Sequence, residues 1–124
     1  GRASRPFDID RDGCIIGEGT VIENSVVGLR CRIGSNVVIR NSVLMGNDYY
    51  TPPGGEVPGR QPLGIGDGTL VDGAIIDKNC FMGRDVRVKN ERGVETTEET
   101  AEGMIVDGIP LIHKGTILPD GWSM

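Results

Sequence analysis

Aliphatic residues recur along this chain at a nearly constant spacing, each closely followed by turn-forming residues. In a first run the steps are six, five, six, six and six residues, at Ile16, Ile22, Val27, Ile33, Ile39 and Met45. A second run has steps of six, five, six and six residues, at Ile65, Val71, Ile76, Met82 and Val88. This spacing indicates a hexapeptide repeat.

The two runs are related by internal duplication. Shifting the first by 49 residues lays segment 16–39 over segment 65–88, and the identical positions are Ile16, Gly17, Gly19, Thr20, Cys31, Gly34 and Val37. A third, shorter instance has its aliphatic positions at Ile112 and Leu118, with Thr116 four residues after the first of them. The repeat therefore continues to the C-terminal end of the sequence.

A repeat of this length predicts an all-β solenoid, the parallel β-helix, in which three hexads close one triangular coil. The recurring aliphatic residue points inward, and the residue four positions later fills the remaining interior; this second set is Thr20, Val26, Cys31, Val37, Val43, Thr69, Ile75, Cys80 and Val86. Glycines directly follow many inward residues, and we expect them to adopt corner conformations that a Cβ disfavours. They are Gly17, Gly28, Gly34, Gly46, Gly66 and Gly83.

Two segments interrupt the repeat and are expected to loop outward from the coils. Residues 47–64 are rich in proline and glycine, and residues 90–103 are acidic and predict one or two helical turns. The expected organisation is a linker or fragment end over residues 1–11 and one β-helix domain over residues 12–124. Because the sequence begins at Gly1 without a methionine, we expect it to be a piece of a longer protein.

Composition narrows the classes of partner. A formal charge of −5 disfavours general binding to nucleic acid or to anionic membranes, and no apolar run approaches the roughly 18 residues of a membrane span. The three cysteines lack the spacing of a zinc site and are expected to be reduced thiols, with Cys31 and Cys80 as packing residues. We therefore expect neither nucleic acid nor a membrane as a partner.

Catalytic motifs are sparse. His113 is the only histidine, so the chain cannot supply the three histidines of a carbonic-anhydrase type of metal site. His113 as the general base of a hexapeptide acyltransferase stays open as an alternative. The glycines of "GIGDG" are explained by the hexad frame rather than by a phosphate loop, and no Ser/His/Asp arrangement is evident. Catalysis by this chain alone is not expected.

Three cations share one position of the hexad, two residues after the inward aliphatic, which should face solvent: Lys78, Arg84 and Lys114. If Val106 and Ile112 resume the frame after the second insertion, Arg84 and Lys114 lie on one face, about 4.8 Å apart, with Lys78 on the neighbouring face. Cations this close, with no carboxylate between them, repel one another unless an anion joins them. The pattern favours a phosphate-bearing ligand; solvated surface cations are the alternative.

Five segments, in order and spacing, resemble the C-terminal domain of glucose-1-phosphate adenylyltransferase: "VVGLRCRIG", "NSVLMGNDYY", "PLGIGDGT", "AIIDKNCFMG" and "IHKGTILPDG". The resemblance implies a left-handed β-helix, an exception to the usual right-handed crossover. It also implies an enzyme that makes ADP-glucose from ATP and glucose 1-phosphate for glycogen or starch synthesis. ATP and Mg²⁺ would bind in an N-terminal catalytic domain that this chain lacks, so no cofactor and no activity are expected here.

The resemblance further implies control by phosphorylated sugar or glycolytic metabolites, contacts with the catalytic domain and other subunits of a tetramer, and a location in the bacterial cytosol or plastid stroma. Lys78 and Lys114 match activator-binding lysines of the family, and Arg84 and Arg30 are candidate helpers. His113 and a shortened 47–64 insertion depart from the plant pattern, which leaves the activator's identity open. A purely structural β-helix that holds subunits together is a further alternative.

Overall fold

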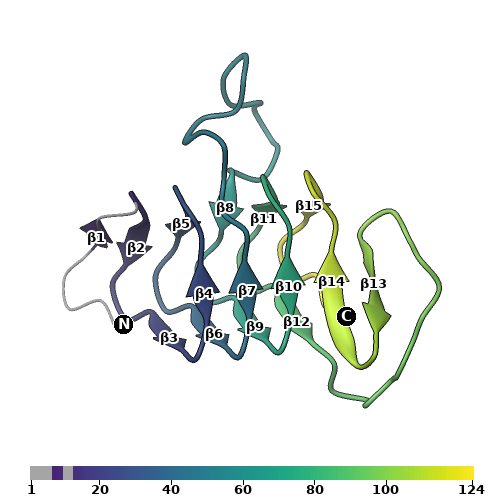
Figure 1. Ribbon diagram of the computed structural model, residues 1–124. Coiled ribbons are helices and arrows are strands. Elements are labelled where there is room, and N and C mark those ends of the chain that lie inside the picture. The colour runs from purple at the N-terminus through teal and green to yellow at the C-terminus, as the bar shows by residue number, and fades with distance from the viewer. Residues whose placement is uncertain (1–6, 10–12) are drawn as a thin grey trace.

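The computed structural model describes residues 7–9 and 13–124, and within them the chain forms strands and turns without any helix (Figure 1). The strands are β1 (Phe7–Ile9), β2 (Ile15–Gly17), β3 (Val21–Glu23), β4 (Val26–Val27), β5 (Arg32–Ile33), β6 (Val38–Arg40), β7 (Val43–Leu44), β8 (Gly64–Ile65), β9 (Leu70–Asp72), β10 (Ile75–Ile76), β11 (Phe81–Met82), β12 (Arg87–Lys89), β13 (Gly103–Val106), β14 (Ile109–Ile112) and β15 (Ile117–Leu118). The predicted linker over residues 1–11 lies outside the described residues, apart from β1.

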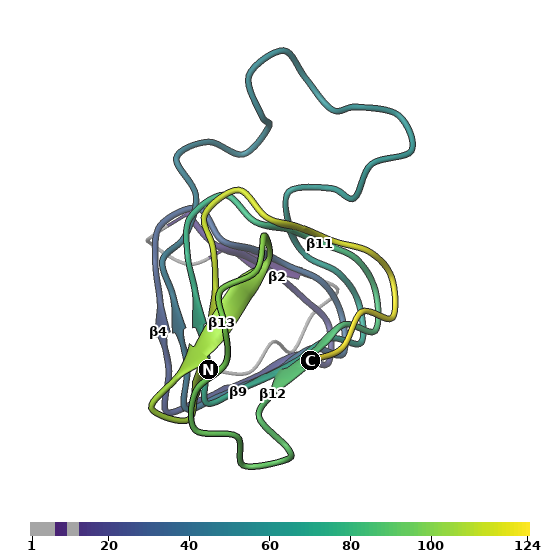
Figure 2. The same cartoon turned by 90° about the vertical axis from the view of Figure 1, so that its right-hand side faces the viewer.

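Three sheets form the sides of a triangular prism, which is clear in the view along its axis (Figure 2). The six-stranded sheet has the order β1-β2-β5-β8-β11-β15, the five-stranded sheet β13-β14-β10-β7-β4, and the four-stranded sheet β12-β9-β6-β3. Neighbouring strands from successive coils pair in parallel, as the hexad pattern predicts for a β-helix. Each coil passes from the six-stranded to the four-stranded to the five-stranded sheet.

An uninterrupted coil contains 17 residues, because one of its three steps is five residues long. The short step always lies between the four-stranded and five-stranded sheets, as from Ile39 to Leu44. Leu44 is buried and pairs with Ile76, whereas Met45 is 45% exposed. The prediction that Met45 points inward is therefore wrong by one residue.

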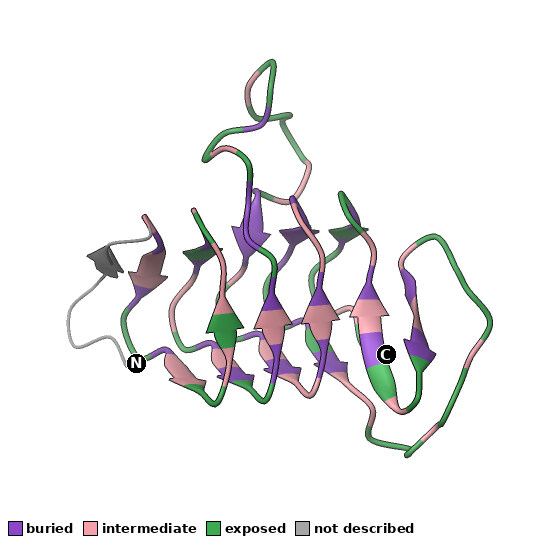
Figure 3. Ribbon diagram, in the orientation of Figure 1, coloured by how far each residue is buried: buried purple, intermediate pink, exposed green. Residues whose placement is uncertain are grey.

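The same short step decides which residues complete the core. Of the predicted second set, Thr20, Cys31, Val37, Thr69, Cys80 and Val86 are buried, which confirms six positions. The three at the short step are wrong: Val26 is 63% exposed, and Val43 and Ile75 are only partly buried. Within a five-residue step the second interior position lies three rather than four residues after the inward aliphatic, so Ser42 and Ala74 are buried instead. Figure 3 shows the resulting burial along each strand.

The glycines after the inward residues are needed for space rather than for backbone conformation. Among them only Gly46 has a positive φ, of 89°, so the predicted reason is wrong for the others. A Cβ built on Gly66 would lie 2.3 Å from the carbonyl oxygen of Gly83 in the next coil. The residues with a positive φ at the corners are instead other glycines and Asn24, Arg30, Asn36, Asn41, Asn79 and Asp85.

The two insertions leave the prism at different corners. Residues between β7 and β8 project where the five-stranded sheet turns into the six-stranded sheet (Figure 2). From this loop the Arg60 guanidinium lies 4.4 Å from the centre of the Phe81 ring. The acidic segment forms no helical turn, contrary to the prediction. It leads into β13, which pairs antiparallel with β14.

Two strands outside the coils cover sheet edges. β13 lies against β14 at one edge of the five-stranded sheet, and β1 pairs antiparallel with β2 at one edge of the six-stranded sheet. Pairing of this kind covers backbone groups that would otherwise be open at the end of a solenoid. Within the hairpin Ile105 is buried and Val106 exposed, so the prediction that Val106 resumes the coil is wrong, while Ile112 does resume it.

Candidate functional site

Three of the four predicted site cations lie at one corner of the prism, where the five-stranded sheet turns into the six-stranded sheet. Arg30 follows β4, Lys78 follows β10 and Lys114 follows β14. β10 pairs with β14 such that Ile76 lies opposite Ile112, so the two lysines occupy equivalent places in adjacent coils. Their backbones are therefore one strand spacing apart, about 4.8 Å. We call the set Arg30, Asn47, Asp48, Lys78, Asn79 and Lys114 the lysine corner.

Arg84 lies at a different corner, between the six-stranded and four-stranded sheets. Because Met82 pairs with Leu118, Arg84 lies opposite Asp120, and its Nη2 is 3.9 Å from Asp120 Oδ2. The prediction that Arg84 and Lys114 share a face, with Lys78 on the next, is therefore wrong. The prediction counted Val106 as one side of a coil, but Val106 lies in the β13–β14 hairpin. Ile112 and the residues after it therefore lie one side of the prism earlier than predicted.

A carboxylate does lie among the cations of the lysine corner, contrary to the prediction. Asp48 Oδ1 is 3.2 Å from Lys78 Nζ. The Asn79 side chain donates to Asp48 Oδ2 at 2.9 Å and accepts the Asp48 backbone N–H at 2.9 Å. The Asn79 hydrogen bond, followed by the interactions with Lys78 and a smaller contribution from Lys114, lowers the pKa of Asp48. These contacts favour the ionised carboxylate beside Lys78.

Hydrogen bonds to backbone carbonyls link the coils at this corner. Asn47 donates its side-chain amide to the Arg30 carbonyl at 2.9 Å, and Arg30 Nη1 donates to the Asn47 carbonyl at 3.3 Å. The Lys78 carbonyl accepts the Gly115 N–H at 2.9 Å. Arg30 therefore faces the same corner, two coils away from Lys78.

Sequence reasoning missed Asn47, Asp48 and Asn79. Asn47 and Asn79 each lie three residues after an inward residue, Leu44 and Ile76 respectively. That signal is visible in the sequence only when Leu44, rather than Met45, is taken as the inward residue. The pairing of Asp48 with Lys78 needed the structure, because it joins residues 30 positions apart across an insertion.

Cys80 lies directly behind the corner and has no exposed nucleophilic character. Its thiol donates towards the carbonyls of Asp77 and His113, each 3.3 Å away. Burial raises the pKa of Cys80 to about 11, so the thiol stays protonated and unreactive near neutral pH. This agrees with its predicted role as a packing residue.

The His113 side chain contacts Glu99 of the second insertion. Its Nε2 lies 3.0 Å from Glu99 Oε2, close enough for an ion pair although the atoms lack hydrogen-bond geometry, and the side chain is 28% exposed. Across the part of the chain that is described, no group of three or more His, Cys, Asp or Glu side chains is arranged to hold a metal ion. Nor is any described helix long and apolar enough to cross a membrane.

Comparison with known protein families matches residues 8–122 to the GLGC left-handed parallel beta-helix domain. The chain belongs to this family. It is the C-terminal domain of glucose-1-phosphate adenylyltransferase, which confirms the resemblance drawn from the five sequence segments. The match also confirms the left-handed β-helix. For this adenylyltransferase domain the match favours a role within the nucleotidyltransferase over the acyltransferase alternative built on His113.

Proposed function

We propose that this adenylyltransferase domain is regulatory and that its lysine corner binds the phosphate of a metabolite effector. The observation that carries the proposal is the register of β10 with β14, which stacks Lys78 on Lys114 in adjacent coils. Two ammonium groups in adjacent coils repel one another, and an oxyanion that accepts hydrogen bonds from both offsets that repulsion. A phosphate dianion fits this arrangement better than a single carboxylate.

Accessibility and family resemblance support the same site. Lys114 is exposed, and the Lys78 side chain is 43% exposed, so both ammonium groups are open to a ligand. Both lysines match activator-binding lysines by resemblance. Arg30 faces the same corner and is the helper we retain, whereas Arg84 lies beside Asp120 at another corner.

The proposed effector is a phosphorylated sugar or glycolytic metabolite of three to six carbons. Catalysis, with ATP and Mg²⁺, belongs to the catalytic domain in this proposal, and the β-helix alone is expected to be inactive. The effector site is then distinct from the reacting atoms. Loss of the effector site should therefore weaken activation without changing the turnover of the enzyme in the absence of effector.

The test uses an adenylyltransferase that carries this domain, assayed for ADP-glucose formation with increasing activator. Lys78→Ala and Lys114→Ala are each expected to raise the activator concentration for half-maximal activation about tenfold, since a charge-assisted contact to an anion contributes about 1.5 kcal/mol. Basal turnover should be unchanged. Arg84→Ala is the matched control, because it removes a cation from the same hexad position, and its effect should stay below about twofold. Unchanged activation in both lysine variants would contradict the proposal.

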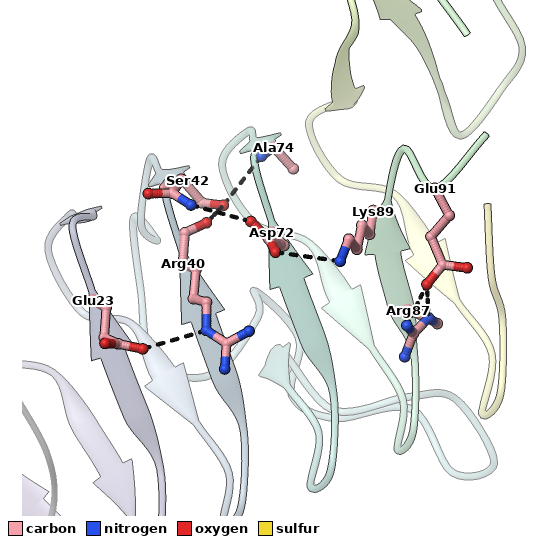
Figure 4. A network of polar contacts seen from close by, with 9 residues as sticks. Glu23, Arg40, Ser42, Asp72, Ala74, Arg87, Lys89 and Glu91 are labelled. Atoms are coloured by element: carbon pink, nitrogen blue, oxygen red, sulfur yellow. Dashed lines mark hydrogen bonds and ion pairs between the residues drawn. The ribbon is translucent and has the colours of Figure 1, made fainter. Parts of the chain in front are cut away.

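A second role, packing of subunits, is favoured by the outer face of the five-stranded sheet. One row across that face contains no charged side chain; it consists of Val26, Val43, Ile75, Leu111 and Met104. Figure 4 shows the contrasting four-stranded sheet, where Glu23, Arg40, Asp72 and Lys89 alternate in sign across the strands. There Arg40 Nε is 3.3 Å from Glu23 Oε1, and Lys89 Nζ is 3.7 Å from Asp72 Oδ2.

We propose that another subunit of the enzyme covers the apolar row, because a continuous row without charged side chains can pack against its own copy across a twofold axis. Ile75→Asp should shift the assembled enzyme to smaller species in sedimentation velocity. Val38→Asp, on the outer face of the four-stranded sheet and also partly buried, is the control and should leave assembly unchanged. Equal effects of both substitutions would count against the proposed interface, as would intact assembly in Ile75→Asp.

A further inference from the structure

The lysine corner contains an anion of its own. The Asp48 carboxylate is 3.2 Å from Lys78 Nζ, and Lys114 is close enough to contribute to the stabilisation of the same carboxylate. Carboxylate and phosphate oxygens accept hydrogen bonds from the same ammonium N–H groups. Asp48 and an incoming phosphate therefore compete for the same hydrogen-bond donors.

Asp48 is positioned for this contact by groups other than the lysines. The Asn79 amide binds both its carboxylate and its backbone N–H, each at 2.9 Å. Asn79 is itself buried, and its backbone N–H donates to the Gly46 carbonyl at 3.2 Å. The carboxylate is thus kept beside Lys78 by a rigid part of the coil rather than by a chance surface encounter.

The ion pair is nevertheless weak enough to be displaced. The Lys78 and Asp48 side chains are 43% and 47% exposed, and pairs this exposed are stabilised only slightly. A dianion that engages two ammonium groups gains more than a single carboxylate that engages one. A monoanion gains little by the exchange.

We propose that Asp48 is a specificity-determining residue of the effector site: its carboxylate competes with the ligand for Lys78 and so restricts binding to groups with the charge of a phosphate. The inference rests on the proposed function, because it requires that the lysine corner bind anions. In this proposal Asp48 opposes effector binding, whereas Lys78 and Lys114 favour it.

The experiment compares wild-type chain with Asp48→Asn in isothermal titration calorimetry with inorganic phosphate and, separately, with acetate, at constant ionic strength and pH 7.5. The asparagine keeps the shape and an acceptor for Asn79 but removes the charge. The dissociation constant for phosphate is expected to fall about three- to fivefold, the range that loss of an exposed competing ion pair allows. The preference for phosphate over acetate should also decrease.

Three further variants separate this effect from others. Glu91→Gln removes the same unit of charge at an exposed carboxylate that pairs with Arg87, and phosphate affinity should change less than about twofold. Asp48→Ala tests the result with a second side chain, should the asparagine disturb Asn79. In the double variant Lys78→Ala with Asp48→Asn the gain should vanish, since the lysine for which the two anions compete is gone.

The outcomes distinguish the two proposals. If neither wild type nor Asp48→Asn binds phosphate, the effector site and the role of Asp48 both fail. If wild type binds phosphate in a Lys78-dependent manner, but Asp48→Asn and Asp48→Ala bind it equally or more weakly, the effector site stands and the competing role of Asp48 is overturned. A gain that persists without Lys78 also overturns it.

Discussion

Two corners of this β-helix present a cation at the same hexad position, yet those cations have different neighbours in the adjacent coils. At the lysine corner Lys78 stacks on Lys114. At the other corner Arg84 lies between Asp67 and Asp120 in the neighbouring coils, and its backbone N–H donates to Asp120 Oδ1 at 2.8 Å. The hexad position alone shows only that a side chain faces solvent. Its neighbours one coil away decide whether it lies beside a second cation, as Lys78 does, or between two carboxylates, as Arg84 does.

The residue that follows each cation also differs. Asn79 and Asp85 both adopt left-handed backbone conformations, with φ of 61° and 54°. Asn79 is buried and binds Asp48 twice, whereas Asp85 is exposed. The lysine corner therefore depends on its asparagine for polar contacts as well as for backbone conformation.

The largest expected effect comes from Asn79→Ala, which removes both hydrogen bonds to Asp48 and places alanine, with a lower αL preference than asparagine, at the turn. The free energy of unfolding should fall by about 2–3 kcal/mol, compared with about 1 kcal/mol for Asp85→Ala. Urea denaturation measures both. Asn79→Gly, which tolerates the positive φ, should recover part of the loss; equal losses for the two alanine variants would remove the distinction between the corners.

A smaller effect follows from the interior residues behind the two cations, Cys80 and Val86. Burial raises the pKa of Cys80 from 9.0 to about 11, so the folded chain holds this proton more tightly than the unfolded chain. The associated stability is fully present below pH 9 and is lost as the pH rises towards 11, by on the order of 2 kcal/mol.

The difference between wild type and Cys80→Ala in denaturant unfolding at pH 8 and pH 10.5 isolates this loss from other titrations. It should shrink as the pH rises. A difference that is independent of pH would show that the thiol is not the titrating group. No such term is expected for Val86, which cannot ionise.

The smallest effect is expected at the arginine itself. Arg84→Ala should lower the free energy of unfolding by less than about 0.5 kcal/mol, because the Arg84 side chain is 71% exposed and its contact with Asp120 is long. The loss should disappear in 1 M salt, which screens exposed pairs. Thermal unfolding at low and high salt measures both. A loss above 1 kcal/mol that survives salt would instead mean that Arg84 packs structurally.

Much of the fold followed from local spacing. The hexad period predicted a parallel β-helix, the solvent-facing position of Lys78 and Lys114, and the burial of Cys31 and Cys80. These are statements about which way a residue faces within its own strand, and that direction depends on near neighbours along the chain. Family resemblance then added the handedness and the family, which spacing did not supply.

The sequence by itself therefore determined the coil, most of its interior positions and the outward direction of the cations. Only the tertiary structure decided that Leu44 rather than Met45 points inward, because both are apolar and local pattern cannot choose between them. It also moved Arg84 away from the lysines and brought Asp48 to Lys78, 30 positions away. Which residues meet across coils depends on the summed lengths of steps, insertions and the β13–β14 hairpin, and those lengths act only once the chain has wound.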